Sequence, residues 1–311
     1  MTAPSDDFIG FAPDDDAPIP YMARTREYYA AIGYTTPYRW AHHVEAPFQP
    51  LRKPLVQSRI AIVTTAAPFD PAKGDQGPGA KYNSGAKFYS VYDGDTSKQH
   101  DVRISHIAYD RIHTSAEDSG TWFPLPQLQR MAREGRIGEA APRFFGAPTN
   151  RRHRVTIATD APEVLARCKA DKVDAAVLVP NCPVCHQTVS LVARHLEANG
   201  ISTVVMGCAK DIVEQAAVPR FLFSDFPLGN SAGKPRDAAS QAFTLELALR
   251  VLEAAPAAQT TVQSPLRWSA DAAWKRDYDN VAALSGEELA RRRREFDAQK
   301  EIARKLRESA A

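Results

Sequence analysis

A regular alternation of apolar and amphipathic segments constrains the second half of this chain more than any other feature. Apolar runs that predict strands occupy 155–159, 174–180, 202–207 and 220–225. Segments that predict helices occupy 162–172, with Asp160 as N-cap, then 184–200, 209–217 and 235–255. Because strands that alternate with helices form βαβ units, we expect an α/β fold. Its sheet is mostly parallel and doubly wound, with helices on both faces and helical extensions at both termini.

The first half of the chain is less regular. The segment 21–33 predicts a helix that ends at Gly33, and the apolar run 59–67 predicts a buried strand. A stretch rich in Gly, Pro and Asp then continues to about residue 101 and predicts a long loop. Beyond it, 102–110 predicts another strand and 125–138 a helix that closes at a glycine.

We divide the chain into four parts. Residues 1–20 form an acidic flexible tail, and 21–57 form an N-terminal segment, rich in aromatic residues and proline, that wraps the surface. Residues 58–256 form the α/β domain, and 257–311 form a C-terminal helical extension. In that extension Ser285 and Glu288 make a capping box ahead of a strongly charged helix, which we expect to be solvated or to contact another subunit.

Composition and charge exclude several classes of protein. The 39 basic and 37 acidic residues nearly balance, which argues against a nucleic-acid partner. Apolar stretches all fall short of the roughly 20 residues that cross a bilayer, and the acidic N-terminus lacks the features of a signal peptide. We therefore expect a cytoplasmic protein that does not bind membranes. Structural disulfides are disfavoured in that compartment, so a close pair of cysteines indicates redox chemistry or metal binding.

Reactive residues follow three successive predicted strands. The first strand runs into Asn181, Cys182, Pro183, Val184, Cys185 and His186. The next is followed by Cys208, and the one after by Asp225. Ligands bind beyond the carboxyl ends of strands in an open parallel sheet, so we expect these loops to share one edge and form a site. Cys208 and Asp225 are candidates to line its pocket.

The Cys182-x-x-Cys185 spacing suits a redox dithiol. Cys182 lies just before a predicted helix, where free backbone N–H groups and the helix dipole favour a thiolate. We expect Cys182 to be the nucleophile and Cys185 to resolve its adduct as an intramolecular disulfide. His186 is a candidate to lower the thiol pKa or to donate a proton. His106 and Asp110, at the end of an earlier strand, are candidates to hold polar groups of a substrate.

The same residues suit more than one kind of site. A Cys₃His zinc site from Cys182, Cys185, Cys208 and His186 is the main rival, but a second closely spaced ligand pair is missing, so we expect no bound metal. The motif is also consistent with a non-catalytic or zinc-stabilised subunit of a larger complex, and with a general dithiol–disulfide reductase. Nucleotide-binding fingerprints are absent. Cys168 is expected to pack inside a helix, and His195 to face solvent.

The stretch 181–230, which begins NCPVCHQTVSLVARHLEANG, resembles the selenoprotein B family of glycine, sarcosine, betaine and D-proline reductases. The resemblance extends over about residues 20–255. It implies reductive cleavage of a C–N bond by a dithiol, with a pyruvoyl group on a separate partner subunit and an amino-acid-like substrate. The family's selenocysteine falls on Cys182 and its partner cysteine on Cys185. The resemblance thus implies an oxidoreductase of amino-acid metabolism, in a homo- or hetero-oligomer, that holds no cofactor itself and draws electrons from a dithiol reductant.

Overall fold

The computed structural model describes residues 17–74, 79–149 and 152–309, so most of the predicted acidic tail lies outside the described residues. Its main sheet has the strand order β10-β9-β8-β7-β1-β6-β3, with β5 beside β1. All pairs in this sheet are parallel except β3 with β6. The strands are β1 Arg59–Thr64, β3 Tyr92–Asp95, β5 Glu139–Ala140, β6 Arg143–Gly146, β7 Ala175–Val179, β8 Ser202–Gly207, β9 Arg220–Phe223 and β10 Thr260–Gln263. The predicted α/β class is confirmed.

Two hydrophobic cores lie on opposite faces of this sheet. Ile60 and Ile62 of β1 belong to one core, and Ala61 and Val63 to the other, because successive side chains of a strand point to opposite faces. The first core contains residues of α2 (Leu125–Arg133) and α7 (Ala238–Ala254). The second contains residues of α4 (Ala161–Ala170) and α5 (Pro183–Ala198). Helices on both faces are therefore confirmed, and they explain why β1 is apolar at nearly every position.

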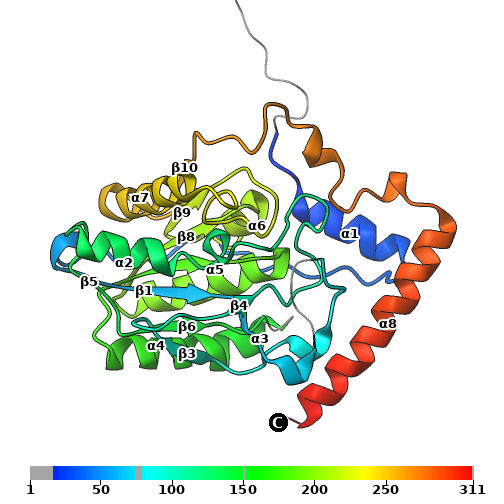
Figure 1. The fold of residues 1–311 in the computed structure, drawn as a ribbon, viewed down its shortest axis with the longest axis horizontal. Helices are drawn as coiled ribbons and strands as arrows, with labels where there is room; N and C mark the ends of the chain where they lie inside the picture. Colours follow the sequence, from blue (N-terminus) through cyan, green and yellow to red (C-terminus); the bar gives the residue numbers. More distant parts are fainter. Residues whose placement is uncertain (1–16, 75–78, 150–151, 310–311) are drawn as a thin grey trace, which may run out of the picture.

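The terminal helices α1 (Tyr21–Ala31) and α8 (Gly286–Ser309) pack together. Phe296 of α8 makes edge-to-face contacts with Tyr29 and Tyr34. Figure 1 shows both helices at the end of the molecule toward which the arrow of β1 points. One half of the predicted capping box is present, since the Glu288 N–H donates to Ser285 Oγ, whereas the Glu288 carboxylate accepts from Arg291 and Arg292. No helix in the described part of the chain is long and apolar enough to cross a membrane.

The strand predicted over 155–159 is wrong. This segment is helical: α3 (His153–Val155) continues through a π-helical turn, Thr156–Asp160, into α4. The buried residues Thr156, Asp160 and Val164 recur every fourth position, which is the period of a helix rather than of a strand. Asp160 has helical backbone angles and lies inside this continuous helix, so it is not an N-cap.

The strand predicted over 102–110 is also wrong beyond its first two residues. Only Val102–Arg103 (β4) pairs, with Ala67–Pro68 (β2) in a small antiparallel ladder. The rest forms turns, and Asp110 Oδ1 accepts the N–H groups of Ile112 and His113. A carboxylate that satisfies backbone donors two and three residues ahead favours a turn over a strand. The predicted helix over 209–217 is present as α6 (Lys210–Gln215).

A buried ion pair fixes the segment before β1 against the sheet. The Arg220 guanidinium lies 2.7 Å from Glu197 Oε1, and both side chains are inaccessible to solvent. Glu197 also accepts the backbone N–H groups of Gln49 and Thr203, and Arg220 donates to the Gln49 carbonyl. The two side chains thus tie α5, β8 and β9 to residues that precede the first strand.

We expect Glu197→Ala to lower the free energy of unfolding by about 3–5 kcal/mol, because it leaves the Arg220 charge buried without a partner. Urea denaturation measures the change. Glu163→Ala removes an exposed helix pair with Arg167 and is the control, expected to cost less than about 1 kcal/mol. Equal losses in the two variants would contradict this role for Glu197.

Candidate functional site

Polar or sulfur-bearing residues follow four adjacent parallel strands. Thr65 follows β1 by one position, Asn181 lies just after β7, and Cys208 and Ser224 come directly after β8 and β9. Since β1, β7, β8 and β9 are neighbours in that order, these residues share the carboxyl edge of the sheet. All four are buried. The convergence expected at this edge is therefore present.

The Cys-x-x-Cys pair lies at the junction of β7 and α5. Cys182 is the N-cap of α5, and its Sγ accepts the backbone N–H of Cys185 at 3.3 Å. Pro183 occupies the first helical position, where its missing N–H would have had no partner inside the helix. The sequence prediction of a strand running directly into a helix at this motif is confirmed.

His106 meets the two thiols. A ring nitrogen of His106 and the Sγ atoms of Cys182 and Cys185 all lie within 4.8 Å of one another. His106 and Cys182 are each 4% exposed, and Cys185 is fully buried. Thr149, which follows β6, donates its hydroxyl to Cys185 Sγ at 3.4 Å. Residues from three separate parts of the chain thus converge on Cys185.

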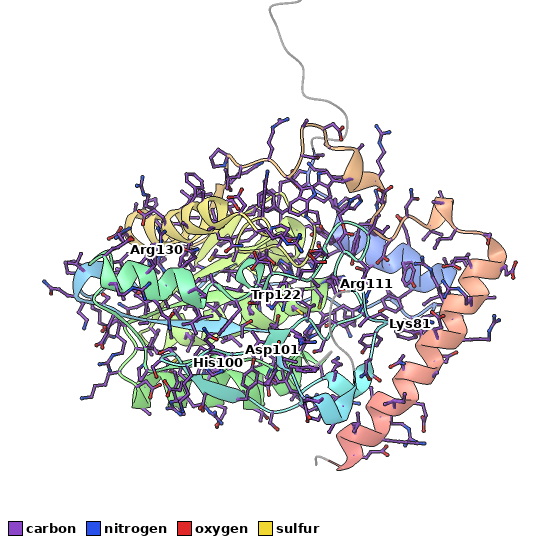
Figure 2. The ribbon with its side chains drawn as sticks, in the orientation of Figure 1. Lys81, His100, Asp101, Arg111, Trp122 and Arg130 are labelled. Carbon is purple, nitrogen blue, oxygen red and sulfur yellow. The ribbon has the colours of Figure 1, made fainter. Side chains whose placement is uncertain are left out.

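Several contacts hold the loop that carries His106. The Arg111 guanidinium donates to the carbonyls of His106 and Ala80, and the Trp122 indole donates to the carbonyl of Val102. Figure 2 labels Trp122 in the middle of the molecule and Arg111 closer to α1 and α8. From the C-terminal segment, the Tyr278 hydroxyl donates to the Ala108 carbonyl. The position of His106 is therefore fixed from both sides of its loop.

The two thiols differ in their proton affinity. Burial alone would raise the pKa of Cys185, but hydrogen bonds from Cys182, His106 and Thr149, with the charge of His106, hold it well below its ordinary value. Burial raises the pKa of Cys182 well above the usual range. The hydrogen bond to Cys185 and the negative charge of Cys185 raise it further. These directions favour a thiolate on Cys185 over one on Cys182, whereas the sequence predicted that Cys182 is the thiol that ionises more readily.

His186 faces backbone atoms instead of the thiols. Its Nδ1 lies 2.8 Å from the Cys182 carbonyl, and its Nε2 accepts the Cys208 N–H at 2.9 Å. A carbonyl can only accept and an N–H can only donate, so this pattern requires a neutral ring protonated on Nδ1. Burial lowers the pKa of His186 to about 4. The ring has no free nitrogen for the expected proton donation, and His106 is the histidine beside the thiols.

The other predicted site residues lie around this centre and differ in their burial and in their partners. Asp110 is buried and burial raises its pKa, while Asp225 forms an ion pair with Lys275. Cys208 Sγ lies 3.7 Å from Ser231 Oγ, and burial raises its pKa to about 12. Cys208 and Asp225 therefore lie on the expected edge with partners of their own. Cys168 is buried in α4 as expected, whereas His195 is only partly exposed.

Buried polar atoms without a hydrogen-bond partner are frequent near this edge. Those among the described residues include Thr65 Oγ1, Ser105 Oγ, His106 Nδ1, Asp110 Oδ2, both side-chain polar atoms of Asn181, and Ser224 Oγ. Leaving such atoms unpaired costs about 1–3 kcal/mol each, so their accumulation indicates a place for a polar ligand. The predicted site residues do not include Thr65, Thr149 or Ser224, and Asn181 is predicted to lie at a strand end without a role. Their position directly after apolar strands was the signal that could have identified Thr65, Asn181 and Ser224.

The same centre has a donor set that suits a soft metal. Two thiols and one imidazole are ligands that zinc takes in proteins. The set weighed from the sequence does not form, because both His186 nitrogens are bonded to backbone and Cys208 contacts Ser231. The structure replaces it with His106, Cys182 and Cys185.

We predict that the reduced protein keeps an ultraviolet thiolate absorbance at neutral pH and loses it only on acidification. The reason is the depressed pKa of Cys185, whose thiolate persists until the pH falls through that value. Cys185→Ser removes this absorbance at neutral pH, because Cys182 stays protonated. His106→Gln moves the titration to higher pH, and Cys168→Ser leaves it unchanged. An unaltered titration in Cys185→Ser would refute the assignment.

Neutral His186 makes stability depend on pH. In the unfolded chain the His186 imidazole becomes protonated below about pH 6.5, whereas in the folded protein it stays neutral down to about pH 4. The stabilisation is complete above pH 6.5 and is lost as the pH falls toward 4, by about 3 kcal/mol in total. His186→Gln keeps one donor and one acceptor but does not titrate, so its unfolding free energy should fall less over this range. Parallel curves for the two proteins would contradict the prediction.

Comparison with known proteins gives distant relatives. No family model matches the chain, and no solved structure matches it. It is 28% identical over 223 residues to the D-proline reductase subunit gamma of Acetoanaerobium sticklandii, a match that covers 71% of this chain and 89% of that one. It is 26% identical over 216 residues to the glycine reductase complex component B subunit gamma of Symbiobacterium thermophilum, covering 65% of this chain and 47% of that longer protein. The chain, with its Cys182/Cys185 pair, is thus distantly homologous to subunits of amino-acid reductases.

Proposed function

We propose that this protein is a dithiol-dependent reductase subunit that cleaves a C–N bond of an amino acid or a related compound. The observation that carries the proposal is the meeting of Cys182, Cys185 and His106 within 4.8 Å at the carboxyl edge of the sheet. Its distant homology to amino-acid reductase subunits points to the same chemistry. Cys182, which takes the selenocysteine position of the resembled family, is the nucleophile.

The first step begins with a proton transfer between the two sulfurs. The Cys185 thiolate takes the proton of Cys182, whose new charge is stabilised by the Cys185 N–H and the start of α5. Cys182 sulfur then attacks the substrate carbon that bears nitrogen. A C–S bond forms, the C–N bond breaks with its electron pair on nitrogen, and the amine takes up a proton.

The second step oxidises the pair. Cys185, deprotonated again, attacks the Cys182 sulfur, so that an S–S bond forms and the C–S bond breaks. The electron pair stays on the substrate carbon, which takes up a proton. The pair has then given two electrons and the one proton that it held, the second proton has come from water, and an external dithiol restores the pair. His106 beside Cys185 stabilises its thiolate each time the thiolate forms.

The buried polar atoms at the same edge suit the remainder of such a substrate. Asn181 offers an amide donor and acceptor, and Ser105 and Thr65 offer hydroxyls, all without partners among the described residues. Neutral hydrogen-bonding groups can bind a carboxylate and an amine without adding charge beside the thiolate. Asp110, whose Oδ2 has no described partner, is the candidate to receive the amine.

The activity requires help from a partner. The carbon that receives the electron pair needs an electron-withdrawing neighbour, and the resembled family obtains it from a pyruvoyl group on a separate subunit. Both relatives are named as subunits. We therefore place this chain in a hetero-oligomer with a pyruvoyl-containing protein.

Adduct trapping tests the roles of the two cysteines. Each variant is incubated with D-proline, sarcosine or glycine, with and without a pyruvoyl-containing partner subunit, and analysed by mass spectrometry and dithiol consumption. Cys185→Ser should form an adduct on Cys182 only slowly, because it lacks the thiolate that takes the Cys182 proton, but the adduct should accumulate, because no thiol resolves it. Cys182→Ser should form none and lose turnover by about 10³-fold or more.

Cys168→Ser is the matched control, since Cys168 lies buried in α4 and burial raises its pKa to about 12. It should leave turnover nearly unchanged. Turnover retained in Cys182→Ser, or lost equally in Cys168→Ser, would overturn the assignment. Metal analysis separates the zinc alternative: one tightly held zinc and no titratable thiol pair would favour a structural metal centre over a reductase.

A further inference from the structure

A separate groove of about 940 Å³ lies outside the thiol site. Four parts of the chain line it: the end of α1 with the segment that follows, residues 152–157, Leu191 of α5, and α8. Its aromatic residues are Tyr29, Tyr34, Tyr38, Trp40 and Phe296. None of the thiol-site residues described above is among those that line it.

The aromatic walls brace one another. Tyr38 makes edge-to-face contacts with Trp40 at 4.6 Å and with His153 at 6.2 Å between ring centroids. Tyr29 and Tyr34 pack against Phe296 across the groove's other side. Rings that support each other in this way form a rigid surface, and Ile157, which is 50% exposed, adds an aliphatic contact point beside them.

The charge of the groove is of one sign. Arg39, Arg152, Arg154 and Lys300 line it together with His42, His43 and His153, and none of its described lining residues is acidic. Arg39, Arg152 and Arg154 are exposed and have no ion pair with any carboxylate in the part of the chain that the structure describes. Elsewhere on the surface Arg136, Arg143 and Arg167 each contact two carboxylates. The groove therefore concentrates unneutralised positive charge in a chain whose net charge is only +2.

The groove wall is bonded to the helix that carries the thiols. Gln187, two residues after Cys185, donates to the Tyr38 hydroxyl at 2.7 Å and accepts the Ala41 N–H at 2.7 Å. Leu191 of the same helix also lines the groove. A molecule bound in the groove therefore lies beside Leu191 of α5.

We propose that this groove docks an acidic peptide segment of a partner protein, one that carries aromatic or aliphatic anchors between its carboxylates. Unpaired guanidinium groups recognise carboxylates, and a braced aromatic surface accepts apolar anchors. The groove's volume is near the upper end of the roughly 300–1,000 Å³ of small-molecule sites. It is lined from four separate segments, which suits a peptide chain. The proposal does not rest on the thiol chemistry.

Fluorescence anisotropy with the full chain tests it. The probe is a fluorescein-labelled peptide of Asp and Glu residues interrupted by two Phe residues. Two matched peptides carry Ala for Phe or Lys for the acids. The acidic Phe peptide should bind with a Kd in the micromolar range and weaken as salt is raised, whereas the basic peptide should not bind.

Two sets of variants locate the binding. Arg39→Glu/Arg152→Glu/Arg154→Glu should weaken the acidic peptide by at least about tenfold, and Ile157→Asp should weaken it as well. The control Arg26→Glu/Arg133→Glu/Arg294→Glu changes three exposed arginines that do not line the groove and should stay within about twofold. Far-ultraviolet circular dichroism checks that every variant is folded.

Three results would overturn the proposal: no binding of the acidic peptide, equal weakening in both triple variants, or equal binding of the Ala-for-Phe peptide. Displacement of the peptide by ATP at similar or lower concentration would also overturn it, because it would make the groove a nucleotide site. Turnover of the thiol site enters none of these readouts, so the two proposals fail independently.

Discussion

The imidazole of His186 joins the two strand ends on which the thiol site is built. It bonds the Cys182 carbonyl with one nitrogen and the Cys208 N–H with the other. The ring lies so close to Gly207 that a Cβ there would be 2.7 Å from it, so only glycine fits at the end of β8. With the ring fixed, the backbone of Cys182 is held at the N-cap position, and both sulfurs are held at the start of α5. The arrangement depends on His186 staying neutral, which its burial ensures.

A buried pair of thiols can carry one negative charge at low cost but not two. The hydrogen bond from Cys182 and the charge of His106 stabilise the Cys185 thiolate. Repulsion from that thiolate opposes ionisation of Cys182. Segments from both ends of the chain enclose this centre: Tyr21 of α1 and Tyr278 of the C-terminal segment are buried and pack edge to face at 5.0 Å. Their exclusion of water strengthens every interaction of the thiolate.

The sequence predicted the neighbouring inner strands β1, β7, β8 and β9 well and the strands at the two ends of the sheet poorly. Runs such as 174–180 and 202–207 are short and mostly apolar, which is typical of a strand buried on both faces. The segment 155–159 is equally β-branched, yet it forms a helix because α4 continues backward through it and buries Thr156 and Asp160 every fourth residue. The short strands β3 and β10 lack apolar runs, since their residues are only partly buried, and they were missed.

The sequence by itself determined the strand–helix junction at Cys182 and Cys185, because the apolar run, the proline and the helix period are all local signals. Only the tertiary structure decided which histidine faces the thiols. His106 and His186 are equally plausible in one dimension, but a ring one residue after Cys185 must turn toward β8, whereas a distant loop can bring its imidazole over both sulfurs. The proton affinities of the two cysteines follow from that contact. Electrostatic interactions act through space over a few ångströms, and sequence spacing does not encode them.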